Sequence, residues 1–453
     1  MKRLRLCLIV LSLLVPNFAR AQQSCDVFYE VIATLFPPQF GFPTVWDAFY
    51  GDRDTMTQIA SGVTHEGGTL MVLARHLDKT THKPVDVTLA EINRRGRALM
   101  EKKHPAREGE DPIKLIATKT GYLSVSNVSI AKNDRVDRQI GISWYSKAGD
   151  FLKDQVLQDD TYDYETFGIL PATDGEGFVV IAHAMSRAKD TDQHGVLMCF
   201  TSEGKQVWRR AYRVGTPNQI GGLMAIDEKN YLAMGHIKLD DGRMAGWVLK
   251  LADDGTILWQ RTYPRGLFSS LRQGAISGVS ATEGAGFLLI GDSMPATGDL
   301  SAAWLLALDS MGEPRWQRFY RRSDYTFSGV GVRTEDDGRI DVLLNGKARE
   351  GADGRSHIRM LTLSRRGVTI ADESYIDGVH ARATDFFQGW NGERIATAIV
   401  EVEDKANADA LGPLPGQNPV PVEHVQIRQQ GWALVASALD PYRDPCDSNG
   451  RRP

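Results

Sequence analysis

Long hydrophobic runs are scarce in this sequence of 453 residues, and a clear one stands at its start. Basic residues from Lys2 to Arg5 precede an apolar run from Leu6 to Val15, and Ala19 and Ala21 are the small residues that a signal peptidase requires. The apolar run is shorter than the roughly 20 residues that a membrane-spanning helix needs. We therefore predict a signal peptide over residues 1–21, cleaved after Ala21, and a periplasmic or secreted protein that does not span the membrane.

Cysteine is also scarce, and cleavage would leave Cys25, Cys199 and Cys446. Few cysteines in a protein with a signal peptide fit an oxidising compartment. Cys25 and Cys446 lie near the two ends, so we predict a disulfide between them. Cys199 lies inside the apolar segment 196–200 and is expected to be a free, buried thiol. Lipid attachment at Cys25 is disfavoured because a polar residue, Gln22, stands where an aliphatic one is needed.

Excess charge of either sign and the known catalytic motifs are lacking as well. A net charge of −4 and a pI near 6.2 exclude a strongly basic protein, so nucleic acid is not an expected partner. The chain has no HExxH, CxxC, phosphate-loop or nucleophile-elbow pattern, and its 10 histidines show no zinc-ligand spacing. We therefore assign no catalytic residues and no metal ligands, and the cofactor is unknown.

What the sequence has instead is a repeat, which is clearest from Tyr231 to Tyr263. The first apolar residue of one strand recurs at steps of 52, 56, 53, 56, 53 and 55 residues, at Leu70, Tyr122, Phe178, Tyr231, Phe287, Ile340 and Ile395. A turn glycine recurs at steps of 53, 55, 51, 57 and 55 residues, at Gly96, Gly149, Gly204, Gly255, Gly312 and Gly367. Two markers in phase at such a period predict an all-β fold, a seven-bladed β-propeller with four antiparallel strands per blade.

Aromatic residues mark the fourth strand of the unit, where Trp and Tyr stand four residues apart. The pairs are Trp208 and Tyr212, Trp259 and Tyr263, and Trp316 and Tyr320. Large aromatics near blade edges fill the widening space between sheets, so we interpret them as core rather than as a cofactor site. Lys153 and Ala371 stand where this tryptophan is expected in the second and sixth units, which makes their outer strands less certain.

The repeat resembles the tryptophan-bearing repeats of secreted bacterial propellers, a broad group with quinoprotein-like relatives. The resemblance rests on residues 247–254, Gly255, Trp259 and Tyr263 and on the matching residues of neighbouring units. Because that group contains scaffolds, binding proteins and enzymes, the resemblance implies a fold and little chemistry.

The two ends of the repeat complete one blade. Residues 45–50 have the Trp and Tyr spacing of a fourth strand, and residues 431–439 resemble a third strand with nothing after it. Pairing of these strands would close the ring and remove free sheet edges. A second assignment takes 425–427 as the third strand and Trp432 onward as the fourth. The predicted domains are the signal peptide, an N-terminal extension at 22–44, the propeller at 45–440 and a C-terminal tail at 441–453.

Polar residues recur five positions after the strand markers, at Arg75, Asn127, His183, His236, Asp292 and Asn345, with Val400 as the exception. Gln58, Gln219 and Gln273 open innermost strands. In a propeller both positions lie on one face, so we predict that these nine polar residues surround one mouth of the channel and bind a ligand. The structural alternative is that they cap strand ends and bond to water or to loop backbone.

Charged loops are expected to join strands two and three on this same face, at 76–86, 189–194, 240–243 and 353–357. Loops on a rigid scaffold commonly carry binding groups. Our leading hypothesis is a module that binds a small molecule, a glycan or a protein through one charged face. The alternative is an enzyme that acts at the channel mouth, on a glycan or with a quinone cofactor.

Overall fold

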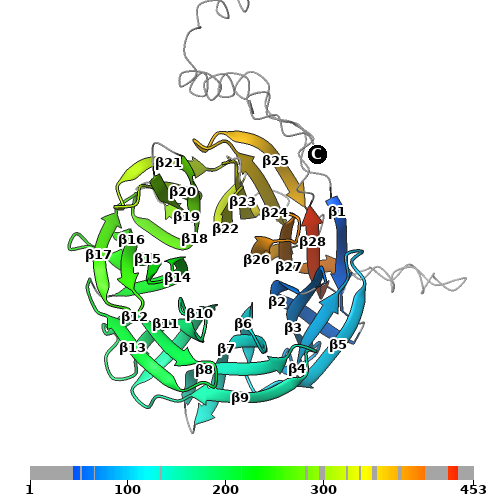
Figure 1. The fold of residues 1–453 in the computed structure, drawn as a ribbon. Coiled ribbons are helices and arrows are strands. Elements are labelled where there is room, and N and C mark those ends of the chain that lie inside the picture. Colours follow the sequence, from blue (N-terminus) through cyan, green and yellow to red (C-terminus); the bar gives the residue numbers. More distant parts are fainter. Residues whose placement is uncertain are drawn as a thin grey trace, which may run out of the picture.

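The structure is a computed structural model that describes residues 44–51, 54–65, 67–132, 135–215, 217–280, 284–294, 301–322, 325–335, 338–348, 355–375, 380–403 and 427–436. Its described part is entirely β-structure and turns, with no helix. Figure 1 shows that the strands form a closed ring of small sheets, with one edge strand of each four-stranded sheet nearest the axis of the ring. The signal peptide, Cys25 and Cys446 lie outside the described residues, so the predictions about them are not tested.

Five of the sheets have four strands. In four of them the strands follow chain order from the inside of the ring outwards, and in the fifth the outermost strand comes from the N-terminal part and closes the ring. They are β2 (Thr55–His65), β3 (Thr69–Asp78), β4 (Pro84–Ile92) and β5 (Ala98–Pro105); β6 (Asp111–Ala117), β7 (Gly121–Lys132), β8 (Arg135–Ser146) and β9 (Phe151–Leu157); β10 (Tyr162–Pro171), β11 (Gly177–Ser186), β12 (Gln193–Thr201) and β13 (Gln206–Tyr212); β22 (Tyr325–Thr334), β23 (Ile340–Ala348), β24 (Ser356–Leu363) and β25 (Thr369–Tyr375); and β26 (His380–Gln388), β27 (Arg394–Glu403), β28 (Ile427–Ala436) and β1 (Thr44–Tyr50).

The remaining sheet has eight strands, and it corrects the predicted blade count. It contains β14 (Asn218–Asp227), β15 (Asn230–Lys238), β16 (Met244–Ala252), β17 (Ile257–Tyr263), β18 (Phe268–Ser280), β19 (Gly284–Met294), β20 (Ala302–Leu308) and β21 (Pro314–Tyr320). Each half repeats the inner-to-outer strand order, but a parallel bridge between Met244 and Phe268 joins the halves. The nitrogen of Met244 also donates to the carbonyl of Leu267 at 3.1 Å. The prediction of seven separate four-stranded blades is therefore wrong: five four-stranded sheets and one continuous eight-stranded sheet form the ring.

The predicted closure of the ring is confirmed. Strand β1 pairs antiparallel with β28, and β28 pairs in turn with β27. Because β28 is one continuous strand that contains Trp432, the second assignment of the C-terminal strands is wrong. The indole of Trp432 donates to Asp47 of β1 at 3.1 Å, so the two ends of the chain are held by a side-chain bond as well as by the sheet.

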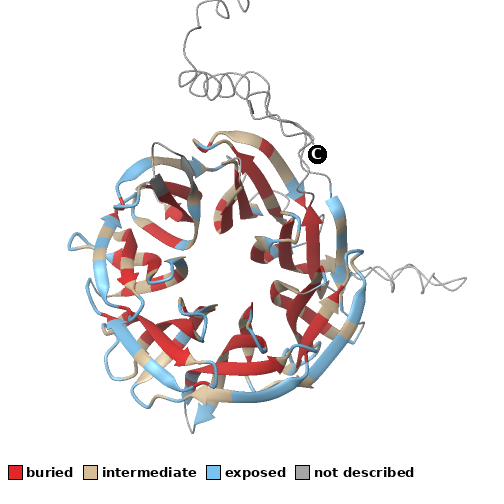
Figure 2. Ribbon diagram, in the orientation of Figure 1, coloured by how far each residue is buried: buried red, intermediate tan, exposed pale blue. Residues whose placement is uncertain are grey.

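The burial of a strand depends on its position in the sheet, as Figure 2 shows. The second and third strands are almost wholly buried, whereas outer strands such as β9 and β13 are largely exposed. The cores lie between successive sheets; Trp247 and Trp304 are fully buried in two of them. Cys199 is a free, buried thiol in the same layer, as predicted. No described helix is long and apolar enough to cross a membrane.

The Trp and Tyr pairs of the outer strands contact the turn glycine of the next unit, which confirms that they are core residues. Each tyrosine hydroxyl donates to that glycine's carbonyl, in Tyr50 to Gly96, Tyr212 to Gly255, Tyr263 to Gly312 and Tyr320 to Gly367, at 2.7–2.8 Å. The strands that lack the tryptophan, β9 and β25, are nevertheless formed. In the second unit the ring of Trp144 of β8 contacts the turn glycine instead. It lies against Gly204 and under the ammonium group of Lys153.

Candidate functional site

The predicted polar residues stand at one level of the ring. Each pairs with the corresponding residue of its innermost strand: Arg75 with Gln58, Asn127 with Asp111, His183 with Glu165, His236 with Gln219, Asp292 with Ser270 and Asn345 with Ser328. Sheet register therefore places this set at the same end of the inner strands, as the sequence predicted. Figure 1 shows those strands on the inner side of the ring.

A β-bulge follows this level on every described inner strand. The ladder skips one residue in each, namely Ala60, Ile113, Phe167, Gly221, Arg272, Val330 and Thr384. A bulge bends its strand and releases backbone groups from the ladder. The polar side chains of the preceding sheet bond to several of those groups.

Three of the six residues accept a hydrogen bond from a backbone nitrogen of the next sheet, and we call these residues latches. The side chain of Asn127 accepts a hydrogen bond from Thr166 N at 2.7 Å, and Asn345 accepts one from Ala383 N at 2.7 Å. Asp292 accepts one from Gly329 N at 3.0 Å. Burying a backbone N–H without a partner costs about 1–3 kcal/mol, so these side chains stabilise the ring where the bulges occur. The structural alternative stated above thus describes part of what they do.

The two histidines are held in a poorly solvated layer. His183 is 7% exposed, and burial lowers its pKa. His236 has a contact of 3.1 Å between Nδ1 and Ser270 Oγ, on the next inner strand, and burial lowers its pKa to about 4. The positive charge of Arg272 lowers the pKa of His236 further, as protonation of His183 would. Both imidazoles are therefore neutral near pH 7.

On the same side of the mouth, Arg272 forms an ion pair with Asp292 at 2.6 Å. The carboxylate is 8% exposed and the arginine side chain 55% exposed, so the guanidinium group reaches solvent from a buried anchor. Burial raises the pKa of Asp292, although Arg272 opposes that shift. Arg272 is a bulge residue that the sequence analysis did not select.

On the facing side, Arg75 joins the first two sheets. Its Nε donates to Gln58 Oε1 at 2.6 Å, and its Nη1 forms an ion pair with Asp111 of β6 at 2.9 Å. Gln58 donates in turn to Gln429 of β28 at 2.7 Å. Arg382 of β26 is exposed at this level and its charge acts on both Arg75 and Asp111.

One residue of the predicted set, Gln273, lies elsewhere, and the position of the exception, Val400, is also corrected. Gln273 follows the bulge of β18, pairs with Ile290 and accepts a hydrogen bond from Val332 N at 2.7 Å. It therefore does not open its strand, and Ser270 is the residue that corresponds to Gln58 and Gln219. In the last sheet Arg382 pairs with Ile399, so Ile399 rather than Val400 corresponds to Arg75.

One residue past each bulge, a buried ionic cluster joins three neighbouring inner strands. Asp385 of β26 accepts hydrogen bonds from Ser61 Oγ of β2 and from Lys114 Nζ of β6, both at 2.5 Å. The side chain of Asp385 is 8% exposed and that of Lys114 is 33% exposed. No sequence signal identifies this cluster, since its members come from separate units and are not alike.

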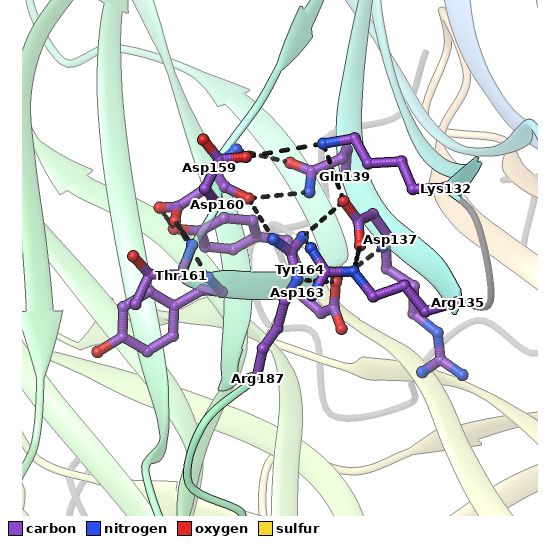
Figure 3. A network of polar contacts seen from close by, with 12 residues as sticks. Lys132, Arg135, Asp137, Gln139, Asp159, Asp160, Thr161, Asp163, Tyr164 and Arg187 are labelled. Atoms are coloured by element: carbon purple, nitrogen blue, oxygen red, sulfur yellow. Dashed lines mark hydrogen bonds and ion pairs between the residues drawn. The ribbon is translucent and has the colours of Figure 1, made fainter.

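A second network lies where the β7–β8 hairpin leaves the ring, and Figure 3 shows it. Asp137 is 1% exposed and lies between Lys132, Arg135 and Arg187, at 3.1, 2.8 and 3.5 Å. Although burial opposes ionisation, these cations hold the pKa of Asp137 below its usual range. Asp163 also pairs with Arg187 at 2.9 Å, which ties the hairpin to β10 and β11. The network makes the hairpin a fixed part of this face.

The site thus offers solvent-facing arginines on a rigid frame of paired carboxylates. The described residues contain no group of three or more His, Cys, Asp or Glu side chains that could hold a metal ion. Arg75 and Asp111, Arg272 and Asp292, and Lys114 and Asp385 each form an ion pair at the mouth. This chemistry suits recognition of polar or charged groups by a surface whose geometry is set before binding.

Comparisons with known proteins give only distant similarity. No family profile matches the sequence, and no curated protein matches it. Among solved structures, the α-L-arabinofuranosidase Arb93A of Fusarium graminearum aligns with a TM-score of 0.44 and 10% identity over 71% of this chain and 98% of that one. The β-propeller domain of the Trilobed protease of Pyrococcus furiosus gives 0.42 and 9% over 76% and 89%. A protein of unknown function from Dyadobacter fermentans gives 0.42 and 10% over 88% and 100%.

Proposed function

We propose that this protein is a periplasmic or secreted binding module and that its ligand docks at the mouth defined above. One observation carries the proposal. The polar residues near the start of the inner strands share a register level, and some exposed charged side chains there are not used in latches. Glu165 and Arg382 are exposed charged residues at this level, and Arg272 is exposed two residues further along β18, at the bulge. A rigid ring fixes their spacing, so little ordering cost opposes binding.

Because three of the predicted residues are latches, fewer residues are proposed to bind the ligand than the sequence suggested. Asn127, Asn345 and Asp292 use side-chain atoms to hold the next sheet, whereas Arg75, His183, His236, Gln58 and Gln219 stay in the proposed binding surface. Gln273 is left out because it lies past the bulge.

A steric block tests the proposal without changing charge. Gly221 is the bulge residue of β14, and β10 carries Phe167 at the same position. An added Cβ at Gly221 would meet its nearest atom at 3.4 Å, which is ordinary contact. Gly221→Phe should therefore fold and narrow the centre of the ring. The matched control is Val207→Phe, at an exposed position of the outer strand β13.

The measurement is native mass spectrometry of the full chain purified from its secreting host, followed by calorimetric titration with the molecules released. We expect wild type and V207F to retain a bound molecule and G221F to lose it, with at least a tenfold weaker affinity. Equal binding by G221F and V207F would place the ligand away from the mouth and end the proposal.

A further inference from the structure

Three neighbouring inner strands carry the strongest charge pattern of the mouth. Strands β26, β2 and β6 lie side by side, and each presents one residue before its bulge and one after it. The outer level consists of Arg382, Gln58 and Asp111, with Arg75 paired behind Gln58. The inner level consists of Asp385, Ser61 and Lys114.

The inner level is fully paired. Asp385 accepts from Ser61 and Lys114 at 2.5 Å each and also from the backbone nitrogens of Gly62 and Phe386. The four donors include a cation, so the negative charge of the carboxylate is compensated within the cluster. This level therefore forms a rigid, neutral floor beneath the mouth.

The charges of the outer level are not balanced. Arg75 and Arg382 are close enough that the charge of Arg382 lowers the pKa of Arg75, together with burial. One carboxylate, Asp111, lies between them, and its ion pair is with Arg75. Within the described part of the chain, Arg382 makes no hydrogen bond or ion pair. Two cations thus share one anion at a partly desolvated position.

A further carboxylate, that of Glu401, does not correct this imbalance. Glu401 accepts a hydrogen bond from Gln429 at 3.0 Å, and Gln429 accepts one from Gln58 at 2.7 Å. No ion pair joins Glu401 to either arginine among the described residues. The amide chain instead fixes Gln58, which holds Arg75 in place through its Nε.

We propose that the ligand of this mouth is an anion and that Arg382 and Arg75 bind its carboxylate or equivalent oxyanion group, above the floor formed by Asp385 and Lys114. The inference rests on the proposed function and names the ligand class for the same site. A guanidinium group presents paired N–H donors that match the two oxygens of a carboxylate, and a fixed guanidinium loses little entropy on binding. An incoming anion also relieves the repulsion between the two arginines.

The test uses Arg382→Gln, because this exposed side chain makes no hydrogen bond or ion pair with any described residue whose loss would disturb the fold. Arg95→Gln is the matched control, since Arg95 is exposed in the β4–β5 turn and its side chain makes no described contact. Titration calorimetry on the full chain compares trigalacturonate, inorganic phosphate and neutral maltotriose. We expect wild type and R95Q to bind at least one anionic probe about tenfold more tightly than maltotriose, and R382Q to lose about tenfold in that affinity.

Salt and the steric block give independent readouts. Raising the salt from low ionic strength to about 0.15 M should weaken anion binding by wild type more than by R382Q, because exposed charges are screened. Binding of trigalacturonate alone would identify a carboxylate ligand, and binding of phosphate as well a general oxyanion site; both support the proposal. Equal affinities of R382Q and R95Q would overturn it, as would anion binding that survives in G221F. If wild type bound maltotriose more tightly than the anionic probes, and G221F lost that binding, the anion assignment would be overturned. The proposed function would then still stand.

Discussion

The hydroxyl group of Tyr263 donates a hydrogen bond of 2.7 Å to the carbonyl of Gly312, on the outer turn of the next unit. The same glycine has φ of +80°, and a Cβ built on it would lie 2.9 Å from the ring of Trp259. One outer strand therefore fixes the turn of its neighbour by a bond and by a close contact.

Gly312→Ala should lower the free energy of unfolding by about 2–4 kcal/mol, since it combines a left-handed backbone with a collision against an aromatic ring. Tyr263→Phe keeps the packing and removes one hydrogen bond, so we expect a loss of about 1 kcal/mol. Chemical denaturation measures both. The exposed glycine Gly242, which has φ of +85° and open space around its Cβ position, is the control for backbone strain alone. If G312A cost no more than G242A, the contact with Trp259 would not matter.

Asp385→Ala should destabilise the protein by about 3 kcal/mol, because it leaves Lys114 without its anion and Ser61 without its acceptor. Lys114→Met should cost less, since Asp385 keeps Ser61 and two backbone donors. A double-mutant cycle of the two substitutions measures their coupling. Strictly additive losses would show that the two side chains do not interact in solution.

Glu335 should make stability depend on pH. Burial raises its pKa to about 7, with the neighbouring carboxyl group of Asp341 acting in the same direction. A pKa above the unfolded value of about 4.3 means that the contribution of this group is present at low pH and is lost as the pH rises through about 7. Glu335→Gln mimics the protonated form, so its stability relative to wild type should increase between about pH 5 and pH 8. A constant difference across that range would contradict the shift.

His236 should act in the opposite sense. Its pKa is lowered to about 4, so the unfolded chain takes up a proton before the folded one does. Stability from this residue is present above the unfolded pKa of about 6.5 and is lost as the pH falls towards 4. His236→Asn, which cannot be protonated, should lose less stability than wild type on acidification from about pH 7 to pH 5. Equilibrium denaturation at both pH values, with H104N as a comparison for a histidine away from the mouth, measures the effect.

The period, the aromatic core and the closure could be predicted from the sequence because each depends on contacts that recur along the chain. The Trp and Tyr spacing reports how one strand meets the next turn, and residues 45–50 show that spacing even though their partner strand is far away in the sequence. Repeated local contacts leave a repeated signal. For the same reason the shared register level of Arg75, His183 and His236 could be predicted before any of their partners was known.

The sequence could not show where the repeat is interrupted. The bridge between Met244 and Phe268 joins two units into one sheet, and it depends on how the linker before β18 lies against β16 rather than on a residue type. Gln273 was misplaced because the connection from β18 to β19 is longer than the matching one in the first unit: Ile276 pairs with Phe287, 11 residues on, whereas Thr64 pairs with Leu70, 6 residues on. Val400 was taken in place of Ile399 because Arg394 occupies the position where the first unit has its first apolar residue, so the marker Ile395 lies one residue nearer the bulge.

By itself, the sequence determined that this chain forms a closed ring of short sheets, because periodic burial and turn glycines allow few other solutions. Tertiary structure alone decided which side chains share a site. Lys114 and Asp385 are 271 residues apart and meet at 2.5 Å because the ring brings β6, β2 and β26 together. It also decided that Asn127, Asp292 and Asn345 serve as latches while Arg382 stays exposed, since a side chain's role depends on whether the next strand offers it a partner.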